Sequence, residues 1–107
     1  MPSGYIGTYT GDASKGIYAF EIQNGRMKIE LAAECENPSY LTLSPDGKNL
    51  YAVVETQSRS GQNGGAVRAY ARDAAGGLRF LGEQLTLGKD PCHLSTDFEG
   101  RFLFCAN

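Results

Sequence analysis

The stretch NPSYLTLSPDGKNLYAVVE at residues 37–55 decides the fold, because the chain repeats it as DPCHLSTDFEGRFLFCAN at residues 90–107. The two segments align without a gap, and Pro38 matches Pro91 near the start of each. In each segment, two short runs rich in apolar residues flank a group containing Asp and Gly, which is typical of two strands joined by a turn. The repeated stretch therefore predicts a β-hairpin that occurs twice in the chain.

A second pair of segments repeats in step with the first, GIYAFEIQNGRMKIELAAE at 16–34 and AVRAYARDAAGGLRFLGEQ at 66–84. A self-similar unit of about 50 residues, made of short strands, is the signature of a propeller blade. We therefore expect an all-β fold, with about two four-stranded antiparallel blades of an incomplete β-propeller ring. This partial propeller spans 1–107, with blade repeats at about 16–55 and 66–107.

The predicted strands of one unit are SYLTLS, NLYAVVE, AVRAYAR and LRFLGEQ, here called A to D in chain order. Residues 5–10, YIGTYT, are expected to form an additional inner strand of type B. The order along the chain is then B-C-D, A-B-C-D, A-B. A small β-sandwich is the alternative, but it does not explain why the segments repeat in step.

Charge and hydropathy exclude two classes of partner. The net charge is −2 at pH 7 without a basic excess, which predicts no nucleic-acid partner. The longest apolar runs, such as LYAVV at 50–54, fall far short of the ~20 residues of a membrane-spanning helix. The opening residues MPSGYIGTYTG lack the basic and apolar segments of a signal peptide. We therefore expect no membrane association and a cytoplasmic location.

The three cysteines contain no CxxC pair and are unevenly spaced, which argues against a zinc site and against a disulfide framework. We therefore expect no metal. Cys105 lies in the apolar run FLFCA and is expected to be a small buried core residue.

Four segments together resemble the N-terminal part of the lactonase family of seven-bladed β-propellers. They are YIGTYTGDASKGIYAFEI, NPSYLTLSPDGKNLYAVVE, GGAVRAYARD and DPCHLSTDFEGRFLFCAN, and they occur in the family's order over essentially the whole chain. The resemblance implies hydrolysis of a sugar lactone, with 6-phospho-D-gluconolactone of the pentose phosphate pathway as substrate and no metal or organic cofactor. Seven blades of about 50 residues need about 350 residues. This chain supplies about two blades, so we expect no catalysis from it alone.

Strand A starts and strand B ends on the same face of a propeller, where the predicted catalytic residues His93 and Glu55 lie. In the resembling family a histidine follows Pro-Cys, which implies that His93 contacts the lactone or transfers a proton. Glu55 ends a B strand, where a carboxylate is placed to activate water. Tyr40 matches His93 in the repeat and is predicted to bind substrate. The alternatives are a histidine bonded to nearby backbone and a solvated carboxylate or partner of a nearby arginine.

Arg59 lies on the same face, in the Gly- and Ser-rich segment QSRSGQNGG that we interpret as a flexible connection between strands B and C. A phosphorylated lactone needs cationic contacts, which makes Arg59 the second predicted substrate-binding residue. A solvated loop residue is the alternative interpretation. The glycines do not predict a phosphate-binding loop, because no helix follows them.

Two other functions fit the same sequence. A propeller fragment can recognise a ligand or protein without chemistry, or it can be a piece with no independent role. In either case an incomplete ring exposes blade faces and strand edges, which predicts self-association through them.

Overall fold

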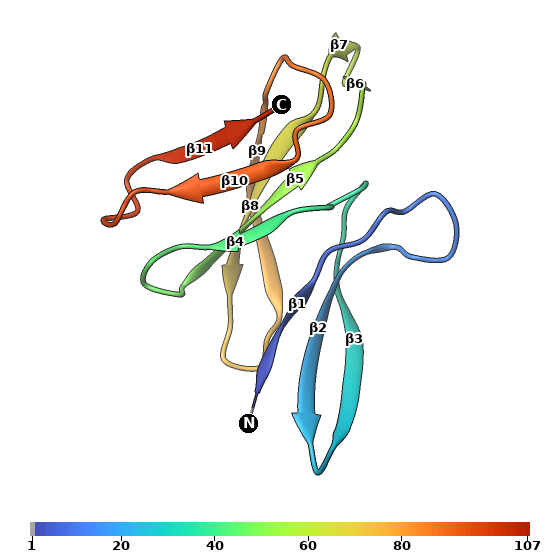
Figure 1. The fold of residues 1–107 in the computed structure, drawn as a ribbon, viewed down its shortest axis with the longest axis vertical. Helices are drawn as coiled ribbons and strands as arrows, with labels where there is room; N and C mark the ends of the chain where they lie inside the picture. Colours follow the sequence, from blue (N-terminus) through green and yellow to red (C-terminus); the bar gives the residue numbers. More distant parts are fainter. Residues whose placement is uncertain (1) are drawn as a thin grey trace.

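The computed structural model describes residues 2–107, which fold into strands joined by turns and loops (Figure 1). The strands are β1 (Ser3–Ile6), β2 (Gly16–Gln23), β3 (Arg26–Glu34), β4 (Leu41–Leu43), β5 (Asn49–Val54), β6 (Ser58–Arg59), β7 (Gln62–Asn63), β8 (Ala66–Arg72), β9 (Leu78–Leu85), β10 (His93–Thr96) and β11 (Leu103–Ala106). Over these described residues, no helix has the length and apolar character needed to cross a membrane.

Three antiparallel blade sheets follow one another along the chain, ordered β1-β2-β3, β4-β5-β8-β9 and β10-β11, and β6 and β7 form a separate two-stranded hairpin. Figure 1 shows the four-stranded sheet between the blue first sheet and the red terminal hairpin. This arrangement confirms the predicted all-β fold of partial propeller blades without a closed ring. In place of about two four-stranded blades, one four-stranded sheet is flanked by sheets of three and two strands. The four-stranded sheet draws two strands from each repeat, and the repeat boundaries at 16–55 and 66–107 stay an interpretation of the sequence.

The first strand differs from the prediction. β1 runs over Ser3–Ile6 and pairs with β2, whereas the sequence predicted a strand at 5–10. The chain leaves the sheet at Gly7, where it passes so close to the backbone oxygen of Pro38 that a Cβ atom would collide with it. The residues after Gly7 therefore belong to a loop that contacts the next sheet.

The main core lies between the first and second sheets. Leu50, Ala52 and Val54 project from one face of β5 and are at most 1% exposed. The alternation of a strand sends these three side chains to the same side. They form one apolar cluster with Ile17, Cys35, Ala66 and Tyr70. The contact between sheets is therefore the principal source of apolar burial.

The opposite face of β5 is covered less completely. Val53 is fully buried and Leu94, from β10, is 1% exposed, but β11 pairs only with β10. Cys105 on β11 is half-buried, so the prediction of a buried core residue was wrong. The two strands of the third sheet are too few to enclose the Cys105 side chain.

The first sheet has one apolar face that no other strand within residues 2–107 covers, here called the open face. Tyr5 marks the side toward the second sheet, because its hydroxyl donates to the carbonyl of Gly76 (3.0 Å). Alternate residues point the other way. The strand register gathers Ile6, Tyr18, Phe20, Ile22, Met27, Ile29 and Leu31 on that side. Met27 and Ile29 are about half exposed, at 52% and 51%.

Candidate functional site

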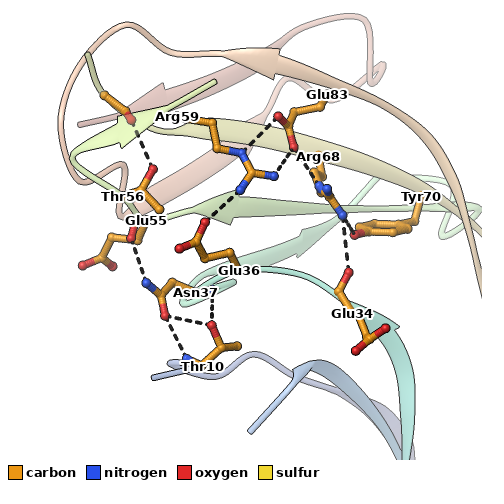
Figure 2. A network of polar contacts seen from close by, with 11 residues as sticks. Thr10, Glu34, Glu36, Asn37, Glu55, Thr56, Arg59, Arg68, Tyr70 and Glu83 are labelled. Carbon is orange, nitrogen blue, oxygen red and sulfur yellow. Dashed lines mark hydrogen bonds and ion pairs between the residues drawn. The ribbon is translucent and has the colours of Figure 1, made fainter. Parts of the chain in front are cut away.

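Asn37 joins the first sheet to the second. It adopts a left-handed backbone conformation (φ 44°), which asparagine tolerates better than most residues. Its side-chain oxygen Oδ1 accepts hydrogen bonds from the backbone N–H (2.8 Å) and hydroxyl (3.2 Å) of Thr10 (Figure 2). Its own backbone N–H donates to the Thr10 hydroxyl (3.1 Å). Asn37 therefore fixes the loop that follows β1.

The same asparagine also holds the end of β5. The side-chain nitrogen Nδ2 of Asn37 donates to the carbonyl of Glu55 (3.2 Å), and the backbone N–H of Glu55 donates to the carbonyl of Asn37 (3.1 Å). Figure 2 shows Asn37 between Thr10 and Glu55. Three segments that are distant in sequence therefore meet at one residue.

This junction places two further hydroxyl groups on the carboxylate of Glu55. Oxygen Oε1 accepts hydrogen bonds from the hydroxyl of Tyr9 (3.1 Å) and from the hydroxyl of Ser39. Glu55 is half-buried, whereas Tyr9 is 64% exposed. The carboxylate is therefore oriented by donors from the loop after β1 and from the segment before β4, and it remains partly accessible. We call Tyr9, Ser39 and Glu55 the carboxylate cluster.

His93 opens β10, the first strand of the third sheet, and its ring contacts the ring of Tyr40. The ring centroids lie 4.8 Å apart and the planes are tilted by 49°. Tyr40 is fixed by its backbone carbonyl, which accepts from the N–H of Val53 (3.1 Å). Within residues 2–107, the recorded contacts of His93 and Glu55 do not join these two side chains. Instead, His93 contacts Tyr40, and Glu55 contacts Ser39, the residue that precedes Tyr40.

Arg59 lies in the small hairpin of β6 and β7, where the sequence suggested an irregular connection. Its Nε and Nη2 donate to the two carboxylate oxygens of Glu83 (3.2 and 2.9 Å), and its Nη1 donates to Glu36 (2.9 Å). The hydrogen bond from Arg59 holds the pKa of Glu83 below its usual range. A phosphate group would therefore have to compete with two carboxylates for Arg59.

Arg68 extends this network toward the core (Figure 2). Its Nε donates to Glu83 (2.8 Å), and its Nη1 donates to the Tyr70 hydroxyl (3.2 Å) and to the carbonyl of Glu34 (3.3 Å). Burial raises the pKa of Tyr70 and of the neighbouring Cys35 thiol. The network therefore ties the second sheet to the end of β3.

No group of three or more His, Cys, Asp or Glu side chains within residues 2–107 is placed to hold a metal ion. Among the described residues, all three cysteines are free thiols.

Tyr9, Asn37 and Ser39 were not predicted from the sequence as residues of the site. One signal for Asn37 was present, because the repeat places Asn37 and Asp90 at the same position before proline. Both adopt a left-handed conformation, with φ of 44° and 55°. Like Asn37, Asp90 bonds to the preceding sheet, through its backbone N–H and the carbonyl of Thr56 (3.1 Å).

Comparisons with known proteins agree over nearly the whole chain. The profile of the family described as "Lactonase, 7-bladed beta-propeller" matches residues 3–107. A 6-phosphogluconolactonase of Bacillus subtilis (strain 168) is 39% identical over 108 aligned positions, which cover 97% of this chain and 30% of that protein. The chain thus spans about a third of the length of this curated relative.

Solved structures give the same result. A protein of Bacteroides uniformis ATCC 8492 assigned as a 6-phosphogluconolactonase superposes with a TM-score of 0.86 at 39% identity, covering 98% of this chain and 30% of that one. A periplasmic gluconolactonase of Pseudomonas aeruginosa superposes with a TM-score of 0.82 at 32% identity, covering 96% of this chain and 30% of that one.

Proposed function

Because the chain belongs to the lactonase family of seven-bladed β-propellers, we propose that it forms one sector of the active site of a sugar-lactone hydrolase. The substrate proposed for the complete ring is 6-phospho-D-gluconolactone, the class named for the Bacillus subtilis relative. The observation that carries the proposal is that Glu55 accepts hydrogen bonds from Tyr9 and Ser39, while His93 packs against Tyr40, the residue that follows Ser39. The other blades would supply the rest of the site.

The reaction needs an activated water and a group that stabilises the opening ester. Water attacks the lactone carbonyl carbon, the carbon–oxygen bond of the ring breaks, and the ring oxygen leaves as a hydroxyl after taking a proton. We assign removal of the water proton to Glu55, whose Oε2 is not engaged by Tyr9 or Ser39. His93 is assigned to orienting the carbonyl or donating the proton, because imidazole changes charge near neutral pH.

Tyr40 and Arg59 remain predicted substrate-binding residues. Tyr40 would bind through its ring, which already packs against His93. Arg59 would bind the phosphate only by releasing one of its two carboxylate partners. Glu36 is the partner more easily released, because its side chain is 54% exposed, against 19% for Glu83. Arg59 is therefore the weaker of the two assignments.

The test is a graft in which residues 3–107 replace the matching segment of the Bacillus subtilis 6-phosphogluconolactonase. We expect the graft to hydrolyse 6-phospho-D-gluconolactone, and His93→Ala or Glu55→Gln to lower kcat/KM about 100-fold, the low end of the contribution of general acid–base groups. Glu30→Gln, at an exposed carboxylate paired with Lys28, is the matched control for Glu55→Gln and should leave kcat within about twofold. A folded graft in which neither His93→Ala nor Glu55→Gln lowers the rate would contradict the assignment.

The chain by itself is proposed to associate with further copies and to lack hydrolytic activity. The supporting feature is the open face, where Met27, Ile29 and Leu31 are between 43% and 52% exposed. Contiguous apolar patches of this kind mark interaction surfaces in soluble proteins. We also propose a cytoplasmic location, supported by three unpaired thiols, although one solved structure is of a periplasmic gluconolactonase.

Light scattering over a concentration series tests the association. We expect a mass above that of the 11.5 kDa monomer that rises with concentration, and Ile29→Lys to shift it toward the monomer. Gln23→Lys adds the same charge at an exposed position on the other side of β2 and should leave the mass unchanged. A monomer at every concentration, or equal effects of both variants, would contradict association through the open face.

A further inference from the structure

The carboxylate cluster offers a ligand only acceptors of hydrogen bonds. An ionised carboxylate donates nothing, so the hydroxyl protons of Tyr9 and Ser39 must both point at Oε1 of Glu55. The Tyr9 and Ser39 oxygens then keep only lone pairs for any further partner. Oxygen Oε2 of Glu55 likewise presents lone pairs. The surface is negatively charged and favours a ligand that donates hydrogen bonds.

Several donors around the cluster are already engaged within the protein. The side-chain nitrogen of Asn37 donates to the carbonyl of Glu55, and the backbone N–H groups of Thr10 and Glu55 donate to Asn37. The cation on this side, Arg59, is paired with Glu83 and Glu36. Arg59, the cation predicted to bind phosphate, is therefore already engaged by two carboxylates.

We infer that Tyr9 and Ser39, which both bond to Glu55, form with it a subsite for the hydroxyl groups of a sugar. The phosphate of a phosphorylated substrate then binds away from this subsite. The inference rests on the proposed function for the identity of the ligand as a sugar lactone or its acid. Two neighbouring hydroxyl groups of a polyol can donate hydrogen bonds to two acceptors that lie close together. The Tyr9 oxygen and Oε2 of Glu55 are such a pair of acceptors. During hydrolysis the attacking water occupies Oε2, and a product hydroxyl takes that place afterwards.

Exposure favours Tyr9 as the specificity-determining residue. The Tyr9 side chain is 64% exposed, so its ring can lie along the apolar edge of a sugar while its oxygen accepts a hydroxyl. Ser39 is less accessible and acts as a positioning residue that holds Oε1. Replacing Tyr9 by phenylalanine removes the acceptor and leaves the ring, which separates the hydrogen bond from the packing.

The test is an amide NMR titration of the 107-residue chain with D-gluconate, and with inorganic phosphate and acetate as separate probes. D-Gluconate should shift the amide signals of Thr10, Asn37 and Glu55, while phosphate and acetate should leave them in place. Tyr9→Phe should weaken gluconate binding about fivefold, as expected for loss of one hydrogen bond. Tyr18→Phe removes a phenol oxygen elsewhere, one that accepts from the N–H of Lys15, and should have no effect on gluconate binding.

Three outcomes would overturn the inference: no gluconate-dependent shift at these amides, equal shifts with phosphate, or gluconate affinity that does not respond to Tyr9→Phe. The hydrolytic graft separates this result from the proposed function. If the subsite is correct, Tyr9→Phe in the graft raises KM and changes kcat little, whereas a lower kcat at unchanged KM contradicts it. Gluconate binding with an inactive graft would instead reject the hydrolase and keep the subsite.

Discussion

Gly65→Ala is expected to lower the free energy of unfolding by about 3 kcal/mol, because Gly65 sits where the second sheet meets the third. A Cβ atom there would lie 2.5 Å from the ring carbon Cδ of Pro91 and would also collide with the carbonyl oxygen of Val54. Neither Pro91 nor Val54 can move easily to make room for a methyl group. Pro91 is a fully buried ring, and Val54 is in the middle of the core.

The position of Gly65 is also fixed by its own backbone. Its N–H donates to the carbonyl of Gly88, and its carbonyl accepts from the N–H of Thr86, each at 3.0 Å. Moving the backbone to admit a methyl group therefore breaks hydrogen bonds or displaces Pro91. Urea denaturation of the two proteins at equal concentration measures the difference.

Gly82→Ala is the matched control, because a Cβ atom at this strand position meets nothing within 4 Å. Its effect should stay within about 0.5 kcal/mol of the wild type, as for most surface substitutions. If Gly65→Ala were as mild as Gly82→Ala, the close approach of Gly65 to Pro91 would be wrong.

Glu83→Gln is expected to cost about 2 kcal/mol at pH 7, because two arginines depend on one carboxylate. Arg59 and Arg68 both contact Glu83 at 2.8–2.9 Å, and all three side chains are less than a quarter exposed. Removing the charge leaves two partly desolvated cations with fewer partners. Complete burial would make the loss larger, and the remaining exposure to water reduces it.

The effect should depend on pH in a definite direction. The hydrogen bond from Arg59 lowers the pKa of Glu83 in the folded protein relative to the unfolded chain. The stabilising contribution of Glu83 is therefore fully present above the pKa of unfolded glutamate, near 4.3, and is lost as the pH falls through the lower folded value. Urea denaturation at pH 7 and at successively more acidic pH should show the difference between wild type and Glu83→Gln shrinking.

Glu30→Gln supplies the comparison with an exposed pair. Glu30 contacts Lys28 at 3.2 Å, and their side chains are 68% and 74% exposed. Such pairs contribute about 0–1 kcal/mol, so this variant should differ little from the wild type at either pH. A loss for Glu83→Gln no greater than that for Glu30→Gln would show that the network does not stabilise the junction.

The strands and their order could be predicted from the sequence because both depend on local patterns. Alternating and continuous apolar runs, separated by Gly- and Asp-containing turns, indicate where strands begin and end. The repeat then shows that the hairpins belong to equivalent blades, which accounts for the agreement between the predicted strand order and the three sheets. The first strand was placed too late, because nothing in YIGTYT reveals that Gly7 passes against Pro38.

The candidate site could be predicted only in part. Repeat position and chain topology placed Glu55, Tyr40 and His93 on one side, and family resemblance suggested their chemistry. Arg59 was interpreted as a residue of a flexible connection, yet it lies in a hairpin and contacts Glu83, which is 24 positions later in the chain. Side-chain partners so distant in sequence leave no periodic signal.

The sequence by itself determined the all-β class, the strand order and the incomplete ring, since these follow from the hydrophobic period, the turn residues and the number of repeats. Only the tertiary structure decided that Glu55 bonds to Tyr9, 46 positions away, and that Asn37 ties both of their segments together. The physical reason is that a hydrogen bond requires two atoms within about 3 Å in a suitable direction. That distance is set by how neighbouring sheets pack, which no single segment specifies.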